Sequence, residues 1–362
     1  MQVHQFLSKK SVWLALFLAL VFLGTFACLP GADASRVDGV KVGLITDSPN
    51  LLDESFNQMA YTGLLRAKND LGIEESVYLP ADWDDIAAKL DQCVADGNRL
   101  CIMVGFSGFD QTYAAALANP DTFFAILDVS YEDYPSNLQG VVFASEQAAY
   151  LAGTLAGYMT ESNILGLIGG MDIPPVNVFL CGFEQGAVDA NPDVTTILTY
   201  AGDFNNPSLG TDIAQDMLDE GADVIFPAAG GTGSGALLTA TQAGAWAVGV
   251  DIDQWVTVFA DGTEAGADHL LTSALKRLDN AVFQIISETI DDSFVSGTVV
   301  YDLSVEGVDL APYHDADPFI PADAKAAVET ARTGLLDGTI DPLRSCAPFE
   351  LYLPMIAADL QP

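Results

Sequence analysis

The sequence has little positive charge. Of its 362 residues only 13 are Lys or Arg, against 50 Asp or Glu, so the formal net charge is −37. Such a chain repels phosphate backbones and anionic membrane surfaces, which argues against nucleic-acid binding and against electrostatic docking on a bilayer. Half of the residues are apolar, so the chain is not a disordered acidic tail. Its length fits about two domains.

The residue patterns of enzymes and metal sites are also missing. The chain has three His, and no Cys or His spacing is typical of a metal centre. No Gly-x-Ser-x-Gly nucleophile elbow follows an apolar stretch. The glycine-rich segment 230–235 lacks the Gly-Lys-Ser/Thr ending of a phosphate-binding loop. We therefore expect no catalytic activity, no cofactor and no metal ion.

The apolar run long enough to span a membrane stands at the N-terminus. Lys9 and Lys10 precede the uncharged residues 11–27, which is typical of a secretory signal peptide within residues 1–34. The sequence leaves two possible processing sites for this segment. Cleavage could follow the Ala-x-Ala site at 32–34, or Cys28 could carry a lipid, although residues 25–27 match a lipoprotein signal poorly. Both predict an exported, periplasmic or cell-surface protein that reaches the membrane only through such a lipid.

Four cysteines follow this segment, at positions 93, 101, 181 and 346. Disulfides are permitted outside the cytoplasm, and four cysteines allow three pairings. Cys93 and Cys101 flank an expected helix-to-strand turn, so they are the favoured local pair. The spacing does not choose among the pairings.

From residue 40 the chain alternates short apolar stretches with amphipathic ones. The first half predicts strands at 40–46, 76–79, 100–105, 123–129 and 138–143, with helices at 56–71, 83–95 and 111–118. The second half predicts strands at 164–169, 195–200, 224–227, 247–250 and 298–302, with helices at 147–159, 177–190, 208–220, 235–243 and 267–290. This alternation is typical of parallel sheets covered by helices on both faces.

The pattern starts twice, which predicts two α/β lobes. We expect residues 40–144 with about 255–297 to form lobe 1, and residues 145–254 with about 298–362 to form lobe 2. Polar or glycine-rich residues follow several strands, at Asp47, 105–107, Asp128, 230–233 and Asp251. Ligands of such sheets bind at the carboxyl ends of the strands, so we expect a ligand cleft between the lobes.

A set of short motifs runs in order through residues 40–300. The motifs are Asp47 with SFNQ at 55–58, GF at 105–106, FFAILD at 123–128, GGMDIPP at 169–175, CGFEQG at 181–186, YAGDF at 200–204, GADVIF at 221–226, AAGGTG at 228–233, WAVGVDIDQ at 246–254, and LTS at 271–273 leading to Lys276. In this order they resemble the basic membrane protein family of bacterial solute-binding proteins, the nucleoside receptors of ABC transporters.

The resemblance implies a type I periplasmic-binding-protein fold, in which two doubly wound lobes are joined by a three-segment hinge. It implies a monomer that binds a nucleoside, most readily a purine nucleoside, and delivers it to an ABC transporter permease. The residues carried over are Phe56 and Phe204 as rings on either side of the base, Asp47, Asn57 and Asp128 at the base edge, and Gly230, Asp251 and Lys276 at the ribose. Gly231 and Asp253 remain alternatives to Gly230 and Asp251.

The chemistry of these residues suits a neutral nucleoside. A Phe ring stacks on a base without needing a hydrogen bond, and one carboxylate can accept from both hydroxyls of a ribose diol. Lys276 would donate to the same hydroxyls and balance the charge of a buried Asp251. The same Asp would also hold a sugar, so the alternative is a protein of this fold that takes up or senses a sugar or another small ligand.

Overall fold

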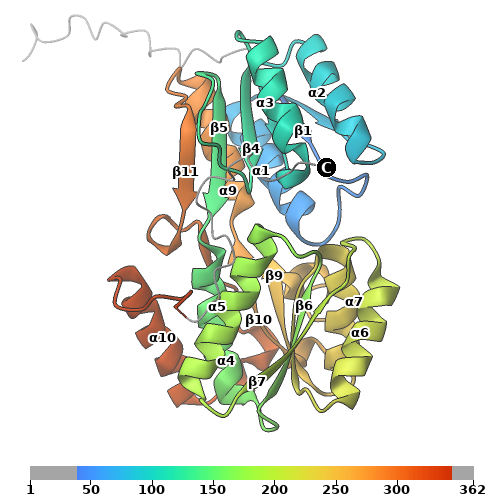
Figure 1. Ribbon diagram of the computed structural model, residues 1–362, viewed down its shortest axis with the longest axis vertical. Helices are drawn as coiled ribbons and strands as arrows, with labels where there is room; N and C mark the ends of the chain where they lie inside the picture. Colours follow the sequence, from blue (N-terminus) through green and yellow to red (C-terminus); the bar gives the residue numbers. More distant parts are fainter. Residues whose placement is uncertain (1–38, 345–362) are drawn as a thin grey trace, which may run out of the picture. The chain divides into compact units, whose positions relative to one another are not determined.

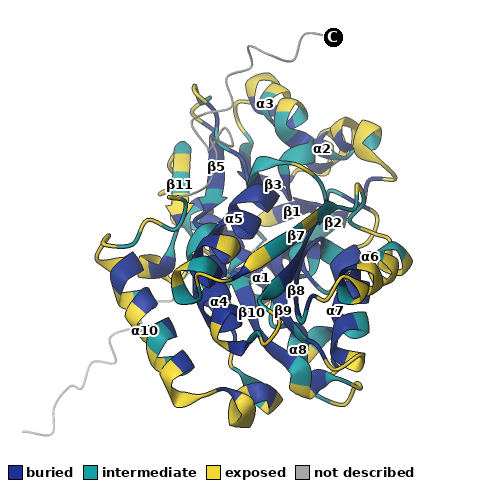
Figure 2. Ribbon diagram, turned by 60° about the horizontal axis from the view of Figure 1, so that its bottom comes forward, coloured by how far each residue is buried: buried dark blue, intermediate teal, exposed yellow. Residues whose placement is uncertain are grey.

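The computed structural model describes residues 39–344, which form two six-stranded sheets with helices packed on both faces of each (Figure 1). The predicted α/β class and the two lobes are confirmed. The central strands of both sheets are buried, the edge strands are partly exposed, and most helices turn exposed residues outward (Figure 2). Residues 1–34 with Cys28, and Cys346 near the C-terminus, lie outside the described residues.

Lobe 1 is built on a fully parallel sheet in the strand order β11-β5-β4-β3-β1-β2. Its strands are β1 (Lys41–Ile45), β2 (Glu74–Tyr78), β3 (Leu100–Met103), β4 (Phe123–Leu127), β5 (Leu138–Phe143) and β11 (Gly297–Tyr301). Its helices are α1 (Phe56–Leu71), α2 (Ile86–Ala95), α3 (Phe109–Ala118) and α9 (Leu278–Ile290).

Lobe 2 has the order β12-β10-β9-β8-β6-β7, and only its edge strand β12 runs antiparallel to its neighbour. Its strands are β6 (Ile164–Gly169), β7 (Thr195–Tyr200), β8 (Val224–Ala228), β9 (Trp246–Asp251), β10 (Leu270–Lys276) and β12 (Val308–Leu310). Its helices are α4 (Ser145–Met159), α5 (Pro174–Ala190), α6 (Pro207–Asp219), α7 (Gly230–Gln242), α8 (Gln254–Thr257) and α10 (Ala322–Leu336). Short 3-10 helices lie at Trp83–Asp85, Phe106–Gly108, Ala267–His269, Leu303–Val305 and His314–Phe319.

The expected long helix at 267–290 is wrong. Ala267–His269 form a short 3-10 helix, the strand β10 follows and pairs with β9 on one side and β12 on the other, and only α9 is an α-helix. A strand buried on both faces reads as a continuous apolar run rather than an alternating one. The sequence LLTSALK therefore also fits a helical period, and only the neighbouring strands decide between the two.

The chain crosses between the lobes three times, after β5, after β10 and after β11, which agrees with the expected three-segment hinge. The expected boundaries of the returning segments differ from these crossings. Helix α8 and strand β10 lie in lobe 2 instead of lobe 1, because β10 completes the second sheet. Strand β11 lies in lobe 1, because it pairs in parallel with β5.

Helices α4 and α5 pack backbone against backbone in lobe 2. A Cβ added to Gly153 would lie 1.9 Å from the carbonyl oxygen of Phe183, and one added to Gly186 would lie 2.1 Å from that of Tyr150. Only glycine permits this approach. The Ala- and Gly-rich sequence of α4 thus allows it to pack closely against α5 directly after the first crossing.

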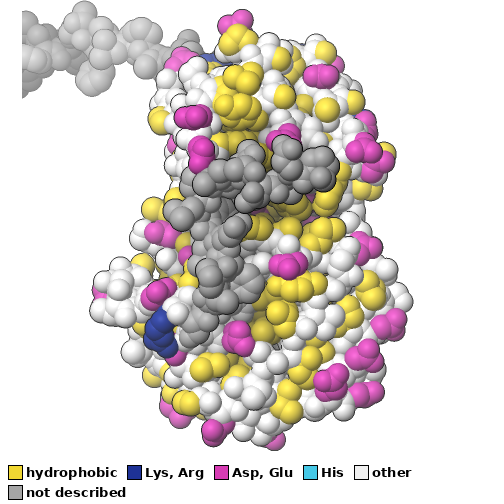
Figure 3. Space-filling view, in the orientation of Figure 1, with side chains coloured by type: hydrophobic (Ala, Val, Ile, Leu, Met, Phe, Trp, Pro, Cys, Tyr) yellow, Lys and Arg dark blue, Asp and Glu magenta, His cyan; other side chains and the backbone are white. Residues whose placement is uncertain are grey.

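Cys93 and Cys101 form a disulfide between α2 and β3, so the favoured local pair is confirmed. Between residues 39 and 344, no helix is both long and apolar enough to cross a membrane. In the same part of the chain, no three His, Cys, Asp or Glu side chains gather in a way that could hold a metal ion. Acidic side chains are scattered over the face shown in Figure 3, where basic side chains are few.

Candidate functional site: an interlobe cavity

A cavity of about 470 Å³ lies between the lobes, at the carboxyl ends of the parallel strands. Lobe 1 contributes Asp47 after β1 and Asp128 after β4. Lobe 2 contributes Asp251 at the end of β9 and Lys276 at the end of β10. Strand ends are where side chains of neighbouring parallel strands converge, and the volume is that of a small-molecule site.

The structure brings all eight predicted binding residues to this cavity. Gly230 lines it and Gly231 does not; Asp251 lines it, whereas Asp253 turns away and accepts a hydrogen bond from His314 Nε2 at 2.7 Å. The eight residues are Asp47, Phe56, Asn57, Asp128, Phe204, Gly230, Asp251 and Lys276. The lipidation candidate Cys28 lies outside the described residues.

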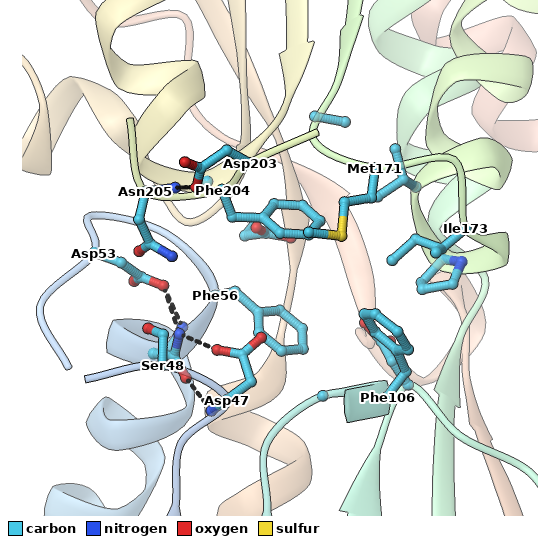
Figure 4. A pocket seen from close by; sticks show the side chains of 18 of the residues that line it. Asp47, Ser48, Asp53, Phe56, Phe106, Met171, Ile173, Asp203, Phe204 and Asn205 are labelled. Carbon is cyan, nitrogen blue, oxygen red and sulfur yellow. Dashed lines mark hydrogen bonds between the residues drawn. The ribbon is translucent and has the colours of Figure 1, made fainter. Parts of the chain in front are cut away.

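Two Phe rings face each other across the cavity, Phe56 from the first turn of α1 and Phe204 from the loop between β7 and α6 (Figure 4). Thr232 of α7 fixes the Phe204 loop. Its N–H donates to the carbonyl of Phe204 at 3.1 Å, and its Oγ1 donates to the carbonyl of Asp203 at 2.8 Å. The backbone of the second ring is thus anchored to the helix that begins at Gly230, whose φ of +55° lies in the left-handed region.

Gly170 makes room for the second ring. A Cβ at this position would lie 2.1 Å from Cε1 and 2.3 Å from Cδ1 of Phe204. Carbon atoms in contact stay about 3.5–4.0 Å apart, so no other residue fits beside the ring in its present place. The motif GGMDIPP therefore includes a residue that positions a cavity wall.

Asp47 lies in a cluster of carboxylates held by one amide. Asn57 Nδ2 donates to Asp47 Oδ1 and to Asp53 Oδ2, each at 2.9 Å. Asp53 also accepts the backbone N–H groups of Ser55, Asn57 and Gln58 at 2.9–3.1 Å, which caps the start of α1. Burial, opposed by the Asn57 bond, raises the pKa of Asp47 to about 7, and the neighbouring charge of Asp53 adds to the rise.

A second polar group joins the lobes at the back of the cavity. Lys276 Nζ donates to Asp128 Oδ2 at 2.5 Å, and Ser55 Oγ donates to Asp251 Oδ2 at 2.6 Å. Burial raises the pKa of Asp251 to about 6, although the charge of Lys276 and the Ser55 bond oppose the rise. Asp128 and Asp251 have φ values of +64° and +65°, a conformation that non-glycine residues keep chiefly where the surroundings hold them.

Lys276 is 2% exposed and sits among three aromatic rings. Its Nζ lies 5.1 Å from the ring centre of Phe56, 5.4 Å from Phe143 and 5.5 Å from Phe179. Rings at this distance attract a cation and replace part of its hydration. The ammonium group is therefore held in place by the protein before any ligand contact is considered.

The cavity is acidic. Among its lining residues six are Asp and one, Lys276, is basic. A ligand that brings phosphate groups would add negative charge beside these carboxylates, whereas hydroxyl and N–H donors find acceptors there. The arrangement suits a neutral ligand that has a flat ring and several hydrogen-bond donors.

Several lining residues were not singled out from the sequence. They are mainly apolar: Trp83, Phe106, Met171, Ile173, Val176 and Phe179. Trp83 and Phe106 meet edge to face with ring centres 5.6 Å apart, and Met171 lies beside Phe204 in the close-up (Figure 4). Phe106, Met171 and Ile173 belong to motifs already quoted, so motif membership was the available signal. Their apolar character alone does not distinguish them from core residues.

Together, two α/β lobes and a cavity between their strand ends define the fold of the type I periplasmic-binding-protein class. A solute-binding protein of an ABC transporter system from Aeropyrum pernix has this fold, with a TM-score of 0.75 and 25% identity over 83% of this chain and 92% of that one. A second one, from Conexibacter woesei, superposes with a TM-score of 0.66 and 23% identity, covering 83% of this chain and 98% of that one.

The chain belongs to the Bmp family, described as PnrA-like ABC transporter substrate-binding proteins, whose model matches residues 40–332. The nucleoside-binding ABC transporter protein BmpA of Lactococcus lactis subsp. cremoris is 31% identical over 351 residues, covering 92% of this chain and 98% of that protein. Basic membrane protein B of Borreliella burgdorferi is 33% identical over 265 residues, covering 71% and 75%. The chain is thus an extracytoplasmic substrate-binding protein rather than an enzyme, and it serves an ABC permease.

Proposed function

We propose that this substrate-binding protein binds a nucleoside, with the base between Phe56 and Phe204. The observation that carries the proposal is the pair of facing rings in a cavity whose polar side chains are mostly carboxylates. Stacking contributes about 1–3 kcal/mol per base and tolerates any base. The name of the Lactococcus lactis relative supports the same ligand class.

The polar residues divide into two groups around these rings. Asp47 and Asn57 meet the base edge, where the carboxylate accepts from ring N–H or amino groups. Asn57, whose Nδ2 already donates to Asp47 and Asp53, orients that carboxylate and offers its Oδ1 as an acceptor. Asp251 accepts from ribose hydroxyls and Lys276 donates to them, while Gly230 allows close backbone approach. Asp128 stands between the groups, because it pairs with Lys276 and its charge raises the pKa of both Asp47 and Asp251.

We place purine nucleosides first, because a bicyclic base covers more of two facing Phe rings than a pyrimidine does. The test is native mass spectrometry of the purified protein, followed by calorimetric titration with inosine, uridine, ribose and inosine 5′-monophosphate. Inosine should bind most tightly, and its monophosphate far more weakly because of the acidic cavity. Tight binding of ribose without any nucleoside binding would instead support the sugar alternative.

A Phe56→Ala variant provides the site-specific arm. It should weaken inosine binding by about 1–3 kcal/mol, roughly 5- to 150-fold, because one stacking face is lost. A variant that binds inosine as tightly as the parent protein would refute this site.

We further propose that the protein acts as a monomer and that residues 1–34 direct export. The intact mass of the mature protein separates cleavage before Ser35 from a lipid on Cys28. Size-exclusion chromatography with light scattering measures the oligomeric state.

A further inference from the structure

A group of contacts joins the two lobes outside the ligand cavity. In lobe 1 the carbonyl oxygen of Glu54, in the loop before α1, accepts two hydrogen bonds from α8 of lobe 2. Gln254 Nε2 donates at 3.2 Å and Thr257 Oγ1 at 3.4 Å. None of these three residues lines the cavity. We call Glu54, Gln254 and Thr257 the clasp.

The lobe 2 side of the clasp is firmly held. Gln254 is 1% exposed, and its Oε1 accepts the backbone N–H of Val250 at 2.9 Å. The backbone N–H of Gln254 donates to Ser273 Oγ of β10 at 3.1 Å. With Oε1 occupied inside its own lobe, the amide NH₂ group is the part of Gln254 that reaches lobe 1.

The lobe 1 side is equally well defined. The N–H of Glu54 donates to Gln58 Oε1 at 3.2 Å, and the neighbouring Asp53 caps α1. Glu54 has a φ of +57°, in the left-handed region that residues other than Gly, Asn and Asp rarely occupy. In this conformation its carbonyl serves both donors of lobe 2, so a disfavoured backbone geometry coincides with the only two bonds that this oxygen makes to α8 among the described residues.

The clasp adjoins the cavity through the next residue. Ser55 donates to Asp251, which does line the cavity. One short loop therefore contacts lobe 2 at a ligand-facing carboxylate and at a buried amide that no ligand in the cavity can touch. A hinge motion that opens the cleft at this loop must break both kinds of contact.

We propose that Gln254 and Thr257 are closure residues, which set the open–closed equilibrium of the two lobes by donating to the Glu54 carbonyl. Affinity for every ligand scales with the population of the closed state. Loss of the clasp therefore weakens all ligands by one common factor. Loss of a cavity residue changes different ligands by different factors, because it removes contacts that depend on the ligand.

Thr257→Val is the cleanest variant, because it keeps the shape of the side chain and removes only the Oγ1 donor. Gln254→Met with Thr257→Val removes both donors at similar volume, and with them the Oε1 acceptor of the Val250 N–H, so the equal effect on different ligands is judged first on Thr257→Val alone. The matched control is Thr239→Val, since Thr239 Oγ1 also donates to a backbone carbonyl, that of Gly235 at 2.9 Å, but within α7. Thermal unfolding of each variant checks that the fold is retained.

The first measurement compares dissociation constants for inosine, guanosine and uridine. We expect Thr257→Val to weaken all three about threefold and the double variant about tenfold or more, mainly through faster dissociation. The control should match the parent protein. Unequal factors for the three nucleosides, or unchanged affinity in the double variant, would overturn the proposal.

The second measurement does not depend on nucleoside binding. Small-angle X-ray scattering of the ligand-free double variant should give a larger radius of gyration than the parent protein, because the open population grows. A radius equal to that of the parent and of Thr239→Val would overturn the clasp, whatever the ligand is. If inosine failed to bind at all, the proposed function would fall while this arm still decided the role of the clasp.

Discussion

Gly170 gives a sharp test of how the second aromatic wall is positioned. We predict that Gly170→Ala weakens nucleoside binding as much as Phe204→Ala does. The new Cβ would lie 2.1–2.9 Å from three carbon atoms of the Phe204 ring. Ordinary contact needs about 3.5 Å or more, so the nearest ring atom must move by roughly 1.4 Å.

The ring rather than the backbone must move. The carbonyl of Phe204 is bonded to the N–H of Thr232, and the backbone of Gly170 is bonded to Ala228 and to Gly202 at 3.0 and 2.7 Å. The φ of Gly170 is not positive, so alanine fits its backbone conformation. We therefore expect a folded protein with a displaced ring and a loss of about 1–3 kcal/mol, roughly 5- to 150-fold in Kd.

Calorimetry with inosine provides the measurement, and a double-mutant cycle provides the decisive comparison. In a Phe204→Ala background, Gly170→Ala should have almost no further effect, because no ring remains to be displaced. The control is Gly231→Ala, whose Cβ would meet only the Phe204 carbonyl at 3.4 Å, an ordinary contact. The reasoning is refuted if Gly170→Ala binds normally, or if its effect persists unchanged without the ring.

Three further predictions concern charge and covalent structure. Lys276→Met removes the ion-pair partner of Asp128 and the cation beside Asp251, so we expect the free energy of unfolding to fall by about 3 kcal/mol at pH 8. The fall should be smaller at pH 5, where the Asp251 carboxyl, with its pKa of about 6, is protonated; urea unfolding at both pH values measures this. Asp47, with a pKa of about 7, is protonated below that pH and then no longer accepts as a carboxylate. Inosine should therefore bind about tenfold more weakly at pH 6 than at pH 8. An inosine affinity that does not change with pH, or a pH dependence that persists in Asp47→Asn, would contradict the acceptor role. Replacing Cys93 and Cys101 by Ser should lower the free energy of unfolding by roughly 2–3 kcal/mol in urea titrations and leave the Kd for inosine unchanged, because neither residue lines the cavity.

Most elements could be predicted from the sequence, because the local pattern and the tertiary structure agree. Helix α1 and strands β5, β6 and β7 have the expected bounds. Strand β10 is the instructive failure, since its apolar residues fit a helix as well as a strand. The pairing with β9 and β12 decides its conformation, and that pairing involves residues distant in the sequence.

Some residues of the site could likewise be predicted from the sequence, and others could not. Polar residues at strand ends, such as Asp47 and Asp251, stand out in the sequence because core packing does not explain a carboxylate directly after a buried strand. Apolar lining residues such as Phe179 do not, since a core position has the same composition. Bonds such as that between Ser55 and Asp251, 196 positions apart, depend on how the lobes meet, and no local pattern reports that.

The shortage of basic residues gives particular weight to Lys276. A buried ion pair such as that with Asp128 rarely stabilises a fold more than apolar side chains of the same size would. The three surrounding rings show that the site has the packing of a core, so an apolar residue would fit there. Stability alone therefore does not explain a cation at this position, whereas the proposed ligand, with its hydroxyl groups, would explain it. Because the same cavity holds six Asp, this one cation cannot offset a phosphate, and the acidic charge disfavours anionic ligands in the cavity as it disfavours nucleic acid at the surface.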